Sequence, residues 1–159
     1  MTLAIRTAGP ADRGTCVDLI DALNAYEATL VDDRLTTRAA AEAAYAAAVD
    51  RVARTRGRIL LAEEDGHPVG LLVFVIDEEH PYVREDVRRY GQVADLVVVE
   101  DARGRGVGRA LLAQAEALTR EAGLKRLAIG ALAANAGALA AYRRAGFGDY
   151  LTLLVKDVS

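Results

Sequence analysis

The segment of residues 103–109 is the most informative stretch of this sequence. It reads Arg103-Gly104-Arg105-Gly106-Val107-Gly108-Arg109 and lies between a valine-rich stretch and an amphipathic one. Glycines allow a tight turn and a close approach of the backbone to a ligand. The first turn of a helix carries unpaired N–H groups and a partial positive charge, and both favour phosphate. The arginines can add charge-assisted contacts. The segment, called the glycine turn below, is therefore a candidate pyrophosphate cradle.

Other interpretations of the glycine turn fit the sequence less well. A dinucleotide-binding G-x-G-x-x-G pattern fails because position 109 is Arg, and a Walker-type site would need G-K-[ST]. An Arg-Gly segment can contact RNA, but this one lies inside a strand–helix pattern and does not repeat. Taken by itself, the turn leaves two alternatives open, a phosphate site and an ordinary tight turn.

Composition bounds the class of protein. The chain has 159 residues, 52% hydrophobic and 27% charged, with a formal net charge of -3. We expect one domain over residues 1–159, with a core large enough to fold. The acidic balance gives no support for a general nucleic-acid binder. A single cysteine, Cys16, excludes an internal disulfide and a cysteine-built zinc site. No signal peptide or membrane span is apparent, so we expect a cytoplasmic protein.

Hydrophobic periodicity predicts the order β-α-α-β-β-β-α-β-α-β. The expected strands are 3–7, 58–63, 69–76, 92–99, 124–130 and a last strand or pair within 147–156. The expected helices are 13–28, 38–56 preceded by Thr37, 107–122 and 137–145. Residues 64–68 form a turn that joins two strands into a hairpin, and 77–91 form a long charged loop. This order predicts a mixed α/β fold, a central sheet with helices on both faces.

Two motifs in this order resemble the GNAT superfamily of acyl-CoA-dependent N-acyltransferases. The first begins at Leu96-Val97-Val98 and continues through Arg103-x-x-Gly106-x-Gly108, similar to the family's [Q/R]-x-x-G-x-[G/A] motif. The second is Asn135-x-x-Ala138-x-x-x-Tyr142-x-x-x-Gly146-Phe147. The resemblance covers residues 92–148. The sequence departs from the family at Glu100, where proline is common, and at Val97, where an aromatic residue is common.

The resemblance implies a fold and a way of binding acetyl-CoA. The sheet would be mixed and mostly antiparallel, and strands 92–99 and 124–130, the fourth and fifth, would splay apart. The glycine turn would hold the pyrophosphate. The pantetheine arm would pair with the backbone of Leu96, Val97, Val98 and Val99, and would contact Asn135 and Ala138. By itself, Asn135 is equally suited to cap a helix.

The resemblance also implies residue roles in catalysis. The backbone N–H of Val98 would stabilise the oxyanion, and Tyr142 would protonate the leaving thiolate. The alternative for Tyr142 is packing of an amphipathic helix on the sheet. Asp95 lies on the same strand face as Val97 and is the best candidate base, or else a solvated residue at a strand end. Glu27 and Asp32 are weaker candidates for binding a cationic amine.

The expected function is that of an N-acetyltransferase, in which a primary amine attacks acetyl-CoA directly in a ternary complex. The acceptor would be a small molecule or a peptide, and we expect no metal, nucleic acid or membrane partner. Cys16 lies on the apolar face of its helix, which disfavours an acyl-cysteine intermediate. The arginine and alanine bias indicates a GC-rich bacterial genome, and a homodimer is consistent with the family. The alternative is a non-catalytic acyl-CoA sensor of the same fold.

Overall fold

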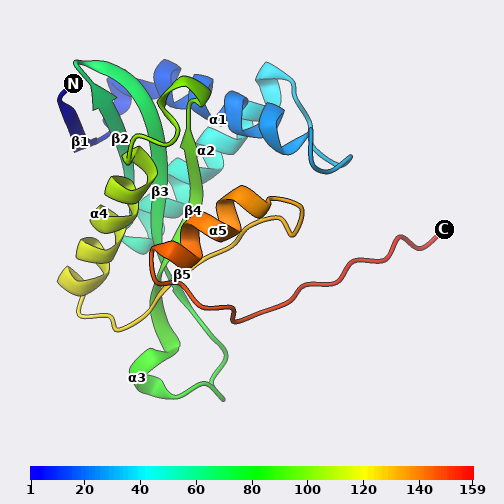
Figure 1. Cartoon of the computed structure of the whole chain (residues 1–159). Coiled ribbons are helices and arrows are strands. Elements are labelled where there is room, and N and C mark those ends of the chain that lie inside the picture. Colours follow the sequence, from blue (N-terminus) through cyan, green and yellow to red (C-terminus); the bar gives the residue numbers. More distant parts are fainter.

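The computed structural model describes residues 1–159 and is built around one five-stranded sheet (Figure 1). Its strands are β1 (Leu3–Thr7), β2 (Arg58–Glu64), β3 (His67–Glu78), β4 (Arg89–Val98) and β5 (Leu127–Ile129). They lie side by side in chain order. All neighbours are antiparallel except β4 and β5, which are parallel. The prediction of a mixed, mostly antiparallel sheet is confirmed.

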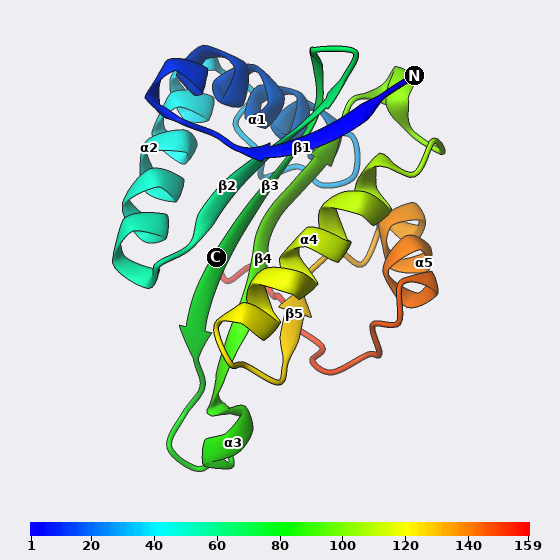
Figure 2. The same cartoon turned by 90° about the vertical axis from the view of Figure 1, so that its left-hand side faces the viewer.

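Helices cover both faces of the sheet, as predicted. The helices are α1 (Arg13–Glu27), α2 (Arg38–Thr55), α3 (Glu85–Arg88), α4 (Val107–Glu121) and α5 (Ala136–Arg144), with short 3-10 turns η1 (Pro10–Asp12) and η2 (Glu100–Ala102). Helices α1 and α2 pack on one face, and α4 packs on the other with α5 beside it (Figure 2). The side chain of Thr37 accepts a hydrogen bond from the N–H of Ala40 and so caps α2.

The central strand β3 supplies side chains to two separate cores. Leu71, Val73 and Val75 are buried against α1 and α2. Leu72 and Phe74 are buried on the opposite face with residues of α4. Successive side chains of a strand point to opposite faces, so a run of apolar residues is expected where both faces are covered. The fold therefore rests on two cores that share one sheet.

A β-bulge in β4 sets the direction of the residues that follow it. Val73 of β3 lies opposite Asp95, but its neighbour Phe74 lies opposite Val93, so Ala94 is an extra residue in β4. Before the bulge, Val93 packs on the α4 face. After the bulge, Val97 packs on the α1 face. Without the bulge, Val93 and Val97 would point to the same face of the sheet. Because of the extra residue, side chains after the bulge point to the opposite face from the one that strict alternation would give.

Strand β5 pairs with only the first part of β4. The paired residues of β4 are Gly91, Gln92 and Val93, and no strand lies beside the rest of β4 on that side. The two parallel strands therefore separate after the bulge, as the resemblance implied. This separation leaves one edge of residues 94–98 without a strand partner.

Two details of the predicted elements are wrong. Residues 147–156 form no strand: the chain is extended there, and side chains such as Leu153 and Leu154 are more than 80% exposed. A strand needs a partner for its backbone groups, and these residues find none within their own chain. The predicted loop 77–91 is shorter, because β3 continues to Glu78 and β4 begins at Arg89.

None of the helices combines the length and the apolar character that crossing a bilayer requires. Cys16 is completely buried in the core against α2, as expected of a packing residue. Burial raises the pKa of its thiol to about 11. The thiolate that nucleophilic chemistry requires is therefore disfavoured.

Candidate functional site

The glycine turn connects η2 to α4, and its backbone departs from ordinary geometry at two residues. Gly104 has a φ of 74° and Gly106, the residue preceding α4, has a φ of 86°. Residues with a Cβ rarely adopt these values. A Cβ at either position would meet no atom within 4 Å, so the requirement for glycine comes from the backbone angle alone. The turn also leaves open space around its backbone.

The N–H groups of this turn have no acceptor in the protein. From Gly104 to Arg109, no backbone N–H donates a hydrogen bond to a backbone or side-chain atom. The first N–H group of the series that is bonded belongs to Ala110, which donates to the carbonyl of Gly106. Consecutive free N–H groups at a helix N-terminus form a concentrated anion-binding surface. These free donors keep the glycine turn a candidate site for a phosphate group.

The three arginines of the turn differ in their contacts. Arg103 donates through Nε to the carbonyl of Val98 (3.0 Å), and its guanidinium carbon lies 4.7 Å from the centre of the Tyr26 ring. Arg105 pairs with Glu64 at 2.9 Å. Arg109 is exposed and forms no ion pair within the protein, so its charge is available to a bound anion.

The free edge of β4 begins next to the glycine turn. The N–H of Val99 donates to the carbonyl of Val69 in the β3 chain segment (2.9 Å). Because successive residues of a strand direct their polar groups to opposite sides, the N–H and C=O of Val98 point away from β3. The bond from Arg103 to the Val98 carbonyl comes from this side. The Val98 N–H therefore faces the gap between β4 and β5, where the resemblance placed an oxyanion.

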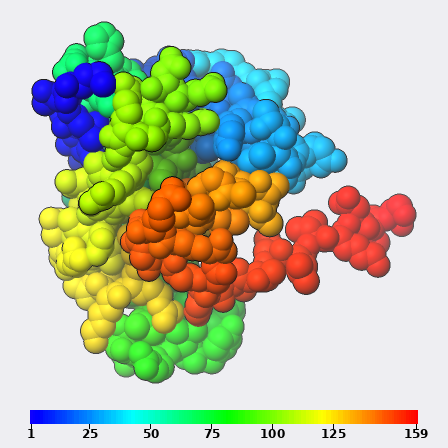
Figure 3. All heavy atoms as spheres, viewed as in Figure 1, coloured from blue at the N-terminus to red at the C-terminus, as the bar shows by residue number.

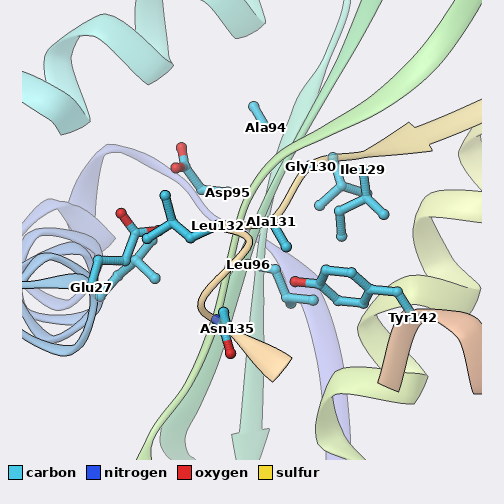
Figure 4. Close-up of a pocket in the computed structure, with 12 residues that line it drawn as sticks. Glu27, Ala94, Asp95, Leu96, Ile129, Gly130, Ala131, Leu132, Asn135 and Tyr142 are labelled. Atoms are coloured by element: carbon cyan, nitrogen blue, oxygen red, sulfur yellow. The ribbon is translucent and has the colours of Figure 1, made fainter. Parts of the chain in front are cut away.

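A pocket of about 60 Å³ lies where β4 and β5 separate. Its lining residues come from α1, β4, the end of β5 and α5, and ten of them are labelled in Figure 4. They are Leu23, Glu27, Val93, Ala94, Asp95, Leu96, Ile129, Gly130, Ala131, Leu132, Asn135 and Tyr142. This central pocket brings together five predicted site residues, Glu27, Asp95, Leu96, Asn135 and Tyr142, which are up to 115 positions apart in the chain.

Tyr142 reaches the central pocket from α5. Its hydroxyl points toward Leu96 (Figure 4), while its ring packs edge-on against Phe147 at 6.2 Å. The hydroxyl makes no hydrogen bond, and no buried polar side-chain atom of the protein lacks a partner, so this hydroxyl is open to the pocket. Burial, together with the negative charge of Glu27, raises the pKa of the phenol above its usual value. Tyr142 both packs on the sheet and presents a protonated hydroxyl.

Asn135 combines a structural contact with a free donor. Its Oδ1 accepts the N–H of Ala138 (3.1 Å) and so caps α5, as one interpretation of the sequence predicts. The hydroxyl of Tyr26 approaches the same oxygen at 3.4 Å. The Asn135 side-chain NH₂ donates to no atom of the protein, and the residue lines the central pocket. Capping therefore fixes the amide and leaves its donor side available.

Asp95 and Glu27 form an acidic wall on the α1 side of the pocket. In Figure 4 they lie on the opposite side of β4 from Tyr142. Burial, and secondarily the charge of Glu27, raises the pKa of the Asp95 carboxyl, whereas Arg51 opposes this rise. Glu27 itself pairs with Nε of Arg34 at 2.6 Å. The third predicted acid, Asp32, is exposed in the loop after α1 and does not line the pocket.

Sequence reasoning missed two residues of this region. Tyr26 precedes Glu27 in α1 and links Arg103 to Asn135, and Arg34 orients Glu27. The helical spacing of Tyr26 from Leu23 is the signal that could have placed it on the inward face, but nothing in the sequence indicates its partners. No group of three or more His, Cys, Asp or Glu side chains is arranged to hold a metal ion.

Comparisons with known proteins agree with this geometry. The model of the "Acetyltransferase (GNAT) family" matches residues 21–147. An IAA acetyltransferase of Azospirillum brasilense is 32% identical over 133 residues, which are 84% of this chain and 76% of that protein. An N-alpha-acetyltransferase MAK3 of Arabidopsis thaliana is 34% identical over 87 residues, 55% of this chain and 43% of that protein.

Solved structures agree at the level of the fold. A GCN5-related N-acetyltransferase from Ralstonia eutropha has a TM-score of 0.74 at 23% identity, with 99% of both chains covered. The aminoglycoside N-acetyltransferase AAC(6')-Iy, solved in complex with CoA, has a TM-score of 0.75 at 15% identity, with 99% of this chain and 95% of that chain covered. Together with the family match over most of the sequence, the sheet and its separated strands show that this chain belongs to the acetyltransferase (GNAT) family.

Proposed function

We propose that this protein transfers an acetyl group from acetyl-CoA to a primary amine. One observation carries the proposal: the central pocket lies in the gap between β4 and β5, with the Tyr142 hydroxyl on one side and two carboxylates on the other. A thioester entering from the α4 face and an amine entering from the α1 face would meet there. Direct transfer in a ternary complex requires such a meeting point.

The glycine turn and the edge of β4 would hold the donor. The free N–H groups of residues 104–109 suit the pyrophosphate, and Arg109 adds positive charge. The pantetheine amides would pair with the polar groups of Leu96 and Val98, which have no strand partner. Arg103 covers the Val98 carbonyl, so donor binding would displace or share this contact. Asn135 and the first turn of α5, at Ala138, would border the same arm.

Each chemical step then has a residue beside it. Asp95 would accept a proton from the incoming ammonium group, directly or through water, and so supply the neutral amine. The amine nitrogen forms a bond to the thioester carbon, and the oxyanion would receive the N–H of Val98. As the carbon–sulfur bond breaks, Tyr142 would donate its proton to the thiolate. The extra proton left on the amide nitrogen would then return to the tyrosinate, directly or through water, and so restore the phenol. Its raised pKa supports this role because the phenol remains protonated at neutral pH.

The acidic wall favours a cationic acceptor. Glu27 and Asp95 both border the pocket, and only Glu27 has a close ion pair. Their negative charge would attract an ammonium group and orient it toward the gap. A pocket of about 60 Å³ admits an amine at the end of a narrow chain, which suits a small-molecule amine or a peptide N-terminus.

The decisive experiment measures thiol release from acetyl-CoA across a panel of amines that includes polyamines, aminoglycosides and peptides. We expect acetyl-CoA to bind by calorimetry and at least one cationic amine to be acetylated, with the product identified by mass spectrometry. Failure to bind CoA would refute the proposal. Tight CoA binding without turnover of any amine would instead indicate a sensor of the same fold.

A further inference from the structure

Tyr26, in the last turn of α1, is held by contacts at its backbone and at its hydroxyl. Its backbone carbonyl accepts hydrogen bonds from the hydroxyl (2.6 Å) and the N–H (3.0 Å) of Thr29. Its own hydroxyl donates to Oδ1 of Asn135, the residue that caps α5, at 3.4 Å. Figure 3 shows the end of α1 in blue, the region of the glycine turn in yellow-green and the start of α5 in orange, close together on one face. The Tyr26 ring therefore has a defined position where these three segments meet.

The guanidinium of Arg103 is positioned by the Tyr26 ring and by the end of β4. Its central carbon lies 4.7 Å from the centre of the ring, which is within the range of a cation–π interaction. Its Nε donates to the carbonyl of Val98 at 3.0 Å. Unlike Arg105, which pairs with Glu64, Arg103 forms no ion pair within the protein. Its charge is therefore held in place by a neutral ring and a neutral carbonyl, and no carboxylate compensates it.

The Arg103 side chain lies on the edge of β4 to which a pantetheine arm would bind. The Val98 carbonyl points away from β3, and an arm that pairs as a strand does must approach the oxygen from that side. The guanidinium already bonds to the oxygen there. Arg103 also begins the glycine turn, whose N–H groups from Gly104 to Arg109 are free. A pyrophosphate bound to those groups would bring negative charge near the guanidinium and draw it away from the carbonyl.

We propose that Tyr26 is a positioning residue that holds Arg103 on the Val98 carbonyl, and that acetyl-CoA must displace this contact in order to bind. Arg103 then has two opposing effects on the donor: it competes with the pantetheine arm, and its charge attracts the pyrophosphate. Tyr26 strengthens only the competition, because its ring stabilises the guanidinium beside the carbonyl. A ligand with the arm but no pyrophosphate meets the competition without the compensating attraction. The inference rests on the proposed binding of acetyl-CoA.

Substitution of Arg103 separates the two effects. NMR titrations of the full chain measure the dissociation constants of CoA and of pantetheine, which has the arm but no pyrophosphate. We expect Arg103→Ala to weaken the binding of CoA several-fold and to strengthen the binding of pantetheine. Arg109→Ala removes a charge from the glycine turn but no contact with Val98, so it should weaken the binding of CoA alone. Pantetheine binding that is unchanged or weaker in Arg103→Ala would overturn the proposal.

Substitution of Tyr26 tests its part directly. Tyr26→Leu releases Arg103 without removing its charge, so CoA and pantetheine should both bind about two- to five-fold more tightly. Tyr26→Phe keeps the ring and should restore the affinities of the wild type. Tyr82→Leu, the same substitution at a tyrosine that is 85% exposed, is the control and should change neither affinity. Thermal unfolding verifies that each variant is folded. Binding of CoA that Tyr26→Leu does not strengthen would overturn this inference alone, whereas a wild type that binds no CoA would refute the proposed function as well.

Discussion

At the scale of single residues, the central pocket separates an acid from a base. Tyr142 lies on the α5 side of the gap, and Asp95 lies on the α1 side. Both groups have a raised pKa, and burial is the main cause in each case. The raised pKa keeps the Tyr142 phenol protonated at neutral pH. The raised pKa of Asp95 makes its carboxylate a stronger base.

Substitution of Tyr142 tests the acid role. Tyr142→Phe retains the packing against Phe147 and removes only the hydroxyl, so we expect kcat to fall on the order of 100-fold with little change in the KM for acetyl-CoA. Tyr90→Phe, in β4 but outside the pocket, is the matched control and should leave kcat unchanged. Steady-state kinetics measure both. Equal kcat values for the wild type and Tyr142→Phe would remove Tyr142 from this role.

The pH profile tests the base. Asp95 can accept a proton only above its pKa, so kcat/KM should rise with pH through that raised value. Glu27→Gln removes a repelling charge, lowers the pKa of Asp95 and should shift this acidic limb to lower pH. Arg51→Gln removes an attracting charge and should shift the limb to higher pH. Kinetics at saturating acetyl-CoA measure the shifts. An acidic limb that persists unchanged in Asp95→Asn would assign the titration to another group.

At the scale of elements, the glycine turn and β4 are both shaped by backbone geometry. Gly104 and Gly106 adopt left-handed φ angles in the turn that leads into α4, and the N–H groups of this turn have no acceptor in the protein. The bulge at Ala94 exchanges the faces of β4 and precedes its separation from β5. Neither feature depends on a catalytic side chain, yet both position the residues that we propose to act.

Gly106→Ala tests whether the left-handed backbone of the glycine turn is needed to bind CoA. Alanine at a φ of 86° is strained, so we expect a loss of about 1 kcal/mol in the free energy of unfolding and a several-fold rise in the dissociation constant for CoA. Gly14→Ala is the control, because Gly14 lies in α1 without a positive φ and has space for a Cβ. Urea denaturation and calorimetry measure the two effects. Unchanged CoA affinity in Gly106→Ala would argue against a cradle in this turn.

At the scale of the whole molecule, one sheet joins two cores. Leu71 belongs to the core beneath α1 and α2, and Leu111 of α4 belongs to the other. Strand β3 contributes to both, so neither core can lose its packing without disturbing the strand that they share. In our proposal the amine and the thioester approach through these two opposite layers and meet at the central pocket, where β4 and β5 separate.

Core truncations test this coupling. Leu71→Ala and Leu111→Ala each remove a fully buried side chain, and each should lower the free energy of unfolding by about 2–5 kcal/mol. Each variant should still unfold in a single transition when followed by circular dichroism and by tyrosine fluorescence. The exposed substitution Val49→Ala in α2 serves as the control, with little change expected. Two separate transitions in either core variant would show that the two layers unfold independently.

The sequence by itself determined the four helices that pack on the sheet, the first five strands, the layers and the location of the glycine turn. Local signals were sufficient because apolar periodicity, Thr37 and Asn135 as helix caps, and the Asp65-Gly66 turn act over a few residues. The motif spacing also predicted Asn135 and Tyr142, which line the pocket. These are properties that neighbouring residues impose on one another.

Only the tertiary structure decided which predicted residues meet. The bulge at Ala94 depends on the register between β3 and β4, and it places Asp95 beside Glu27 while Asp32 remains outside. The strand expected within 147–156 is absent, although its residues favour strands, because these residues pair with no strand of the sheet. Register and pairing arise from contacts between residues distant in sequence, and local propensity does not contain that information.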